Sequence, residues 1–196
     1  MKLIDILLES VNYEKVIDGL FKEVPEMDSI GTKEQYAEYL DTIFPNSKFR
    51  EIVYHGGSLD VKDRGKDPFT GEFGGKHGIY FTKSKGMANK YLKSNVSRVS
   101  GDYVDRRKLF TAILNIENPL PSKYFRWWKY GLDRIGDKEY EVVKKHNADG
   151  LIDLGFLSKI KVTDFGTQIV IFNTDQIHIL GGKEDIDKFR QYVKNK

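Results

Sequence analysis

The stretch IVYHGG (residues 52–57) joins a short run of strand-forming residues to a histidine and two glycines. Ile52, Val53 and Tyr54 are β-branched or aromatic, which favours a β-strand. Taken alone, a histidine followed by two glycines is ordinarily part of a turn. The stretch therefore predicts a strand that ends near His55, and it leaves open why an imidazole lies there.

The composition fits one globular domain without metal. The chain has 196 residues, of which 39% are hydrophobic and 31% charged, and its net charge is +3. A chain of this length can bury a core without disulfides. It contains no cysteine, which excludes disulfides and thiolate metal sites. Its histidines show no metal-ligand spacing, so we expect no metal; they are His55, His77, His146 and His178.

The sequence carries no signal for a membrane protein or for secretion. No apolar run approaches the ~20 residues that are needed to cross a bilayer. Met1–Ser10 is too short and, at Asp5 and Glu9, too acidic for a secretory signal. The absence of cysteine suits a reducing compartment. We expect a monomer in the cytoplasm with no membrane partner.

Hydrophobic periodicity predicts helices at both ends of the chain and short strands between them. The predicted helices are residues 1–23, 32–44, 84–93, 125–129, 138–146 and 184–194. The predicted strands are residues 52–54, 79–82, 109–116, 151–154, 169–172 and 177–180. Thr32 is a predicted N-cap because Gln35 follows three residues later, and PEMDSIG (25–31) is predicted to be a break. Since strands and helices do not alternate regularly, the sequence predicts an α+β fold.

Two further stretches combine a strand with an unusual polar residue. In GGKHGIYFTKSKGMANKYL (74–92), glycines lead into a strand that contains Tyr80, and a helix with Tyr91 follows. The glycines precede the strand, so they do not form a dinucleotide-binding fingerprint. In GTQIVIFNTDQIHILGG (166–182), Gln168 opens an otherwise apolar strand. Taken alone, Tyr80 and Tyr91 are ordinary packing aromatics and Gln168 is an edge residue that faces water.

In their order and spacing, these stretches resemble the ADP-ribosyltransferase superfamily. The resembling branch has a His–Tyr–Glu triad and includes diphtheria toxin and the poly(ADP-ribose) polymerases. The resemblance covers roughly Phe49–Gly181, and ADGLIDLG (148–155) with VIFNTDQIHILGG (170–182) is similar to phage- and prophage-encoded members. It implies an N-terminal helical segment (1–46) and a catalytic domain (47–196). The implied core is a split, mainly antiparallel β-sheet with flanking helices.

The resemblance also implies a site for NAD+, which is the substrate that donates ADP-ribose. The implied catalytic residues are His55, Tyr80 and Gln168. The imidazole would bind a hydroxyl of the adenosine-side ribose, the glycines would let the nicotinamide carboxamide reach the main chain, and the tyrosines would stack on the nicotinamide. The implied residues that contact NAD+ are His55, Gly56, Gly57, Tyr80, Phe81, Thr82 and Tyr91.

Gln168 departs from the family pattern, which has a glutamate at this position. Glutamine keeps a hydrogen-bond acceptor for the ribose but lacks the negative charge. A charge-assisted bond is about twice as strong as a neutral one, so the loss is on the order of 1–2 kcal/mol, or about tenfold in rate. This favours single transfer over chain elongation. Glu72 and Asp164 are candidates for a substitute acid.

The N-terminal sequence and the distribution of charge bear on which molecule accepts the ADP-ribose. MKLIDILLE (1–9) resembles the capsid-targeting leaders of proteins packaged in tailed-phage heads, which implies injection into a bacterial host. The acceptor would then be a host protein or nucleic acid. A basic cluster that begins at Lys83 is either a solvated face or a binding surface for the pyrophosphate or a nucleic acid. An alternative is a catalytically inactive relative that serves as a binding module.

Overall fold

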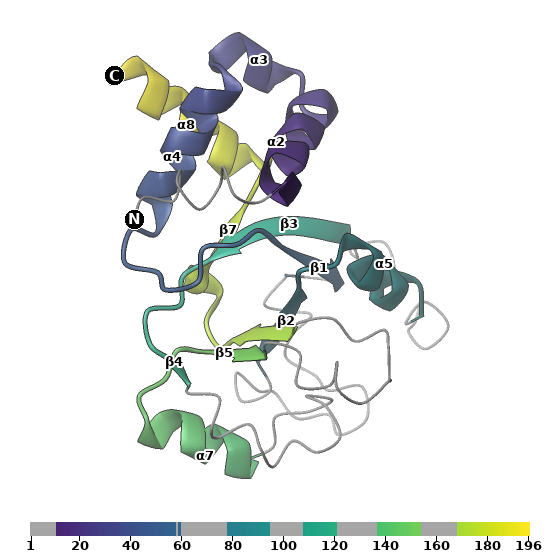
Figure 1. Cartoon of the computed structure of the whole chain (residues 1–196), viewed down its shortest axis with the longest axis vertical. Helices are drawn as coiled ribbons and strands as arrows, with labels where there is room; N and C mark the ends of the chain where they lie inside the picture. Colours follow the sequence, from purple (N-terminus) through teal and green to yellow (C-terminus); the bar gives the residue numbers. More distant parts are fainter. Residues whose placement is uncertain (1–10, 58, 60–77, 95–107, 121–136, 154–167) are drawn as a thin grey trace.

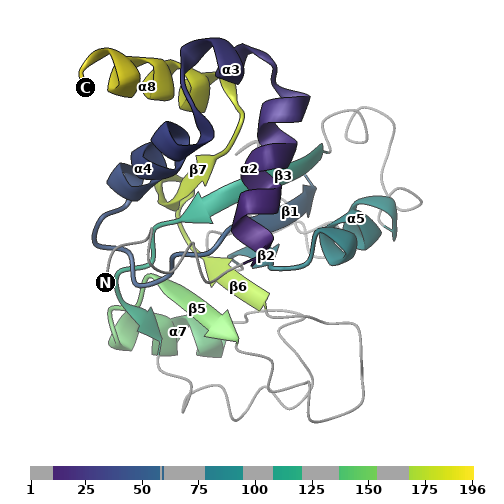
Figure 2. The same ribbon diagram turned by 45° about the horizontal axis from the view of Figure 1, so that its top comes forward.

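The computed structural model describes residues 11–57, 59, 78–94, 108–120, 137–153 and 168–196. The fold is α+β, as the sequence predicts: a mixed, mostly antiparallel sheet of seven strands with helices around it (Figure 1). The sheet is curled, and Figure 2 shows its strands between a group of helices at one end and a single helix at the other.

The two strands that carry the first two motifs lie in the middle of the sheet. The strands are β1 (Val53–Gly57), β2 (Ile79–Thr82), β3 (Lys108–Leu114), β4 (Pro119–Leu120), β5 (Gly150–Asp153), β6 (Gln168–Ile171) and β7 (Ile177–Ile179). Their order is β4-β5-β6-β2-β1-β3-β7. Strands β4 and β5 are parallel, and the other neighbours are antiparallel. Strand β6, which carries the third motif, is therefore the neighbour of β2.

Most described helices gather beside one edge of the sheet. They are α2 (Val11–Glu23), α3 (Glu26–Ile30), α4 (Lys33–Ile43), α5 (Lys85–Ser94), α7 (Asp137–Lys145) and α8 (Lys183–Lys194), with a 3₁₀ turn, η5, at Thr174–Gln176. Helices α2, α3, α4 and α8 lie together next to β3 and β7 (Figures 1 and 2). Helix α7 lies at the opposite end, near β4 and β5, and α5 lies beside β1.

Local sequence signals place most of these boundaries. Thr32 caps α4 as predicted, because its side chain accepts from the Gln35 N–H and Gln35 accepts from the Thr32 N–H. The predicted break at 25–31 does separate α2 from α4, but it contains a short helix that was not expected, α3, in which Met27 is completely buried. The short strand β4 was not expected. The predicted helix at 125–129 and the first ten residues lie outside the described part of the chain.

Hydrophobic residues cover both faces of the sheet. On one face lies a buried cluster that includes Val53, Phe81 and Ile169. On the other face, Tyr54 and Ile113 pack against the helices α2, α4, α5 and α8. The second cluster joins the N-terminal helices to the sheet, so these helices share a core with the domain predicted to begin at residue 47.

Candidate functional site

The structure brings the first two motifs into direct contact through His55. Its Nδ1 lies 2.8 Å from the carbonyl oxygen of Tyr80 on the neighbouring strand. A carbonyl oxygen only accepts, so Nδ1 carries the proton of this bond. The ring also lies near Phe81 and Phe110, with centroids 5.4 Å and 6.2 Å away. The imidazole is thus partly buried and held in one orientation in the middle of β1, which continues to Gly57 and does not end near His55 as predicted.

Gly57 gives the imidazole its space. A Cβ built on Gly57 would lie 2.8 Å from Nε2 of His55, which is closer than real Cβ contacts. Any larger residue would therefore push the ring away from its present position. The space that the His55 ring needs therefore explains why residue 57 is a glycine, and no ligand is required for this explanation.

Gly56 has a different structural reason. A Cβ at this position would lie 1.9 Å from the main-chain oxygen of Ala88 in α5. Ala88 is itself buried, so the helix rests directly on the backbone of β1. The sequence interpretation was that Gly56 lets a ligand approach the backbone. In this structure that place is occupied by α5.

The side chains of His55 and Tyr80 lie on opposite faces of the sheet. Residues alternate between faces along a strand, and the His55 ring packs against the ring of Phe81, the residue after Tyr80. The Tyr80 ring packs on the other face, against a cluster that includes Leu151 and Val170. The two motifs therefore meet through the Tyr80 backbone, and the structure does not bring their side chains together.

Phe81 and Thr82 have clear packing roles. Phe81 is buried in the same cluster as Val53 and Ile169. Thr82 is also buried, and its hydroxyl accepts from the Ser84 N–H, which shapes the turn into α5. Their expected contacts with NAD+ stay a prediction.

The remaining predicted site residues lie on other parts of the chain, and not all of them are described by the structure. The backbone of Gln168 pairs with Thr82 across β2 and β6, so position 168 is one strand away from Tyr80. Tyr91 lies on α5 and is the exposed large hydrophobic residue of the described chain, at 37% exposure. Glu72 and Asp164, the candidates for a substitute acid, lie outside the described residues.

A second histidine, His178, occupies a buried polar cluster that the sequence analysis did not single out. Its Nε2 donates to Oδ1 of Asp185 at 2.7 Å. The other carboxylate oxygen, Oδ2, accepts from the Tyr36 hydroxyl at 2.6 Å and from the Gly181 N–H at 2.7 Å. Asp185 is completely buried. A buried carboxylate needs such donors to offset its lost hydration.

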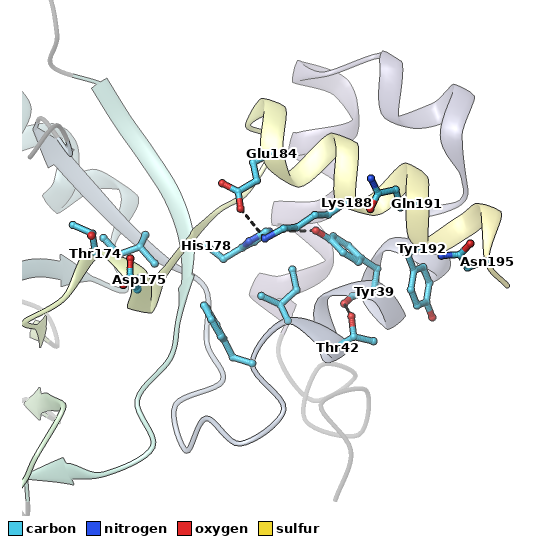
Figure 3. A pocket seen from close by; sticks show the side chains of 13 residues that line it. Tyr39, Thr42, Thr174, Asp175, His178, Glu184, Lys188, Gln191, Tyr192 and Asn195 are labelled. Atoms are coloured by element: carbon cyan, nitrogen blue, oxygen red, sulfur yellow. Dashed lines mark hydrogen bonds and ion pairs between the residues drawn. The ribbon is translucent and has the colours of Figure 1, made fainter.

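A pocket of about 680 Å³ opens beside this cluster, between α4, α8, β7 and η5. Figure 3 shows Tyr39 pointing toward His178 in its wall, with Glu184 and Lys188 at the rim. The Tyr39 hydroxyl donates to the main-chain oxygen of Asp185 at 3.3 Å. Burial first, and then the charge of Asp185, raises the pKa of Tyr39. The only signal in the sequence is an acidic residue soon after the glycine turn that follows His178, which is too common to single out.

Neither a metal cluster nor a membrane span is found in the parts of the chain described here. Among the described residues, no three or more His, Asp or Glu side chains lie together as metal ligands. None of the described helices is long and apolar enough to cross a bilayer.

Comparison with models of known protein families finds no match, and comparison with curated proteins finds no similar sequence. A functional assignment therefore rests on the motifs and on the geometry described above.

Proposed function

We propose that the protein transfers single ADP-ribose groups from NAD+ to a macromolecule. The observation that supports this most is the bond from His55 to the Tyr80 carbonyl. It joins two motifs that are separate in the sequence and that both resemble the transferase family. The position of β6 beside β2 adds support, because it sets Gln168 one strand from Tyr80.

The chemistry would need binding and charge stabilisation rather than a metal. The bond between the ribose C1′ and the nicotinamide nitrogen breaks, and its electron pair leaves with neutral nicotinamide. A nucleophilic oxygen or nitrogen of the acceptor forms the new bond to C1′ and releases its proton to solvent. Positive charge grows on the ribose in the transition state, so hydrogen bonds from rigid groups around the ribose accelerate the reaction. The fixed imidazole of His55 is the group proposed to bind a hydroxyl of the adenosine-side ribose and thereby to position NAD+ for the reaction.

The resemblance extends the proposal to the protein's biological setting. In this view the chain has the split-sheet transferase fold, acts as a phage effector that is packaged in the virion, and modifies a protein or nucleic acid of the bacterial host. Residues 1–9 would then be a capsid-targeting leader.

One observation favours a second candidate, a catalytically inactive relative that binds a partner. The rings of His55 and Tyr80 lie on opposite faces of the sheet, so no ligand bound to one face of the sheet contacts both rings. The identity of residue 168 also favours this candidate, because glutamine lacks the charge of the family's glutamate.

Labelled NAD+ distinguishes the two candidates. The purified protein is incubated with NAD+ labelled in the ADP-ribose part and with a bacterial lysate, and nicotinamide release is measured in parallel. We expect label in macromolecules and loss of this label in His55→Ala and in Tyr80→Ala. His146→Ala, a histidine after α7 at the other end of the sheet, is the matched control and should keep full activity.

Restoring the acid sharpens this test. We expect Gln168→Glu to speed nicotinamide release about tenfold, because a carboxylate adds charge stabilisation. Gln191→Glu, on the exposed side of α8, adds the same charge elsewhere and should change nothing. No release by the unmodified chain and by Gln168→Glu would establish the inactive candidate instead.

A further inference from the structure

The pocket between α4, α8, β7 and η5 has in its wall a histidine whose second ring nitrogen is not used by the fold. His178 is 6% exposed, and its side-chain contacts, to Asp185 and at 3.5 Å to the Tyr39 hydroxyl, both use Nε2. A carboxylate only accepts, so Nε2 carries a proton and Nδ1 of the neutral ring is an acceptor.

This Nδ1 atom is open to the pocket. It has no hydrogen-bond partner among the described residues, and it is not one of their side-chain atoms that are both unpartnered and sealed from solvent. His178 lines the pocket, while the bond on Nε2 fixes its ring. The pocket therefore has a rigid acceptor in its wall, which a ligand with a donor group would satisfy.

The rim of the pocket presents acceptors and donors together. Glu184, Lys188 and Gln191 follow one another along one face of α8, and Asp175 lines the pocket from η5 (Figure 3). Lys188 and Glu184 form a pair at 2.7 Å. Within the described chain, the carboxylate of Asp175 and the amide of Gln191 make no hydrogen bond or ion pair. Both groups are exposed and available to a ligand.

The aromatic rings of the pocket are already engaged. Tyr39 is buried, and its ring centroid lies 5.7 Å from that of Tyr192. The Lys196 ammonium lies over the Tyr192 ring, 5.6 Å from its centroid. A planar base would have to displace these groups in order to stack, so the rings serve as walls.

The charges at the rim disfavour an ionic ligand. The carboxylates of Asp175 and Glu184 repel an anion, and Lys188 is itself paired. An organic ammonium ion only donates, so it offers no acceptor to the Gln191 amide. A hydroxyl group both donates and accepts. A neutral ligand with several hydroxyl groups therefore matches the acceptors and the donors of this pocket at once.

We propose that this pocket binds a sugar, either free or as the terminal residue of a glycan. One hydroxyl donates to Nδ1 of His178, and others bond to Asp175 and Gln191 at the rim. The volume of about 680 Å³ lies within the range of roughly 300–1,000 Å³ that is usual for small-ligand pockets. None of the proposed transferase residues lines this pocket, so sugar binding and transferase activity stand or fall separately.

An NMR titration of the whole chain with D-glucose, D-galactose and D-mannose tests the proposal. A ligand of this size reaches a Kd of about 1 mM. We expect the ¹⁵N signal of His178 Nδ1 to move as the sugar binds, because its lone pair gains a donor. The ring signals of His146, at the other end of the sheet, should stay in place. Binding of the methyl glycosides as well identifies a glycan residue as the ligand, and binding of the free sugars alone identifies a free sugar.

A matched pair of variants tests the rim. Asp175→Ala removes one acceptor and should raise the Kd about tenfold. Asp187→Ala removes a carboxylate from α8 that pairs with Arg190 and does not line the pocket, so it should leave the Kd unchanged. Equal weakening in both variants would show that net charge alone matters and would overturn the proposal.

Three other outcomes would also overturn it. One is no binding of any of the three sugars at about 50 mM, far above the expected Kd. Another is binding that moves the ring signals of His146 and leaves His178 Nδ1 in place. The third is tighter binding of adenosine or of spermidine, which would identify a planar base or an organic cation as the ligand.

Discussion

Two histidines lie on the same sheet, on either side of β3, and they are held in different ways. His178 on β7 is buried and bonded to the fully buried carboxylate of Asp185. His55 on β1 is partly buried and bonded to a neutral main-chain carbonyl. A histidine bonded to a buried carboxylate supports the fold, whereas a partly buried histidine oriented by a main-chain carbonyl is a candidate for a binding group. The difference separates a structural centre from a candidate site.

The largest effect is expected at the structural centre. Asp185→Asn replaces an accepting oxygen with an NH₂ group, so one of three buried donors loses its acceptor. We expect the free energy of unfolding in urea to fall by about 3 kcal/mol. Asp187→Asn, which breaks a more exposed pair with Arg190, should cost less than about 1 kcal/mol. Equal losses would show that His178 is no more structural than a surface residue.

A smaller loss is expected next to the other histidine. Gly56→Ala places a methyl group on the Ala88 carbonyl and forces α5 to move. We expect the free energy of unfolding to fall by about 2 kcal/mol. Gly19→Ala is the control, because nothing lies within 4 Å of its Cβ and it lies inside α2; it should stabilise the protein by up to about 1 kcal/mol. If Gly56→Ala is neutral, α5 does not rest on β1 as described.

The tyrosine beside His178 should make stability depend on alkaline pH. Burial and Asp185 raise the pKa of Tyr39 in the folded protein. A raised pKa means that the folded state keeps a proton that the unfolded state releases near pH 10. Stability is therefore full below pH 10 and declines above it, by up to about 1.4 kcal/mol per pH unit.

The Tyr39→Phe variant should lack the part of this decline that Tyr39 causes. The measurement is the free energy of unfolding in urea between pH 9 and 11. The exposed Tyr91 provides the control, and Tyr91→Phe should leave the decline as it is. Burial also raises the pKa of Tyr54, so part of the decline persists in Tyr39→Phe. An identical decline in both variants would contradict the placement of Tyr39 beside Asp185.

The smallest effect concerns the cap of the helix that carries Tyr36 and Tyr39. Thr32→Ala removes the side-chain half of the capping box of α4. We expect a loss of about 1 kcal/mol in the free energy of unfolding, and Thr32→Ser should retain most of it. A loss as large as that of Asp185→Asn would mean that the cap, not the buried carboxylate, holds α4 in place.

The sequence predicted features that depend on local pattern. The strands at Ile79–Thr82 and Ile177–Ile179 and the cap at Thr32 follow from propensity and from spacing within a few residues. The short helix at 26–30 was missed because its stability comes from Met27, which is buried by partners elsewhere in the chain.

The sequence predicted which strands carry the candidate site residues, but not which face of the sheet each side chain occupies. The motifs placed His55, Tyr80 and Gln168 on three strands, and these strands are indeed consecutive in the sheet. The register between strands decides which face each ring occupies, and no local pattern specifies it. For the same reason, the sequence could not show that Gly56 faces a helix or that His178 meets Asp185.

The bond between Tyr36 and Asp185 also bears on how the chain folds as it is made. The two residues are 149 positions apart, so the N-terminal helices cannot close around the carboxylate until residue 185 has left the ribosome. Phe21, Met27 and Tyr36, all buried in the finished core, stay exposed to water during that interval. Contacts this distant in sequence slow folding, and the waiting helices are natural substrates for a chaperone that binds apolar segments.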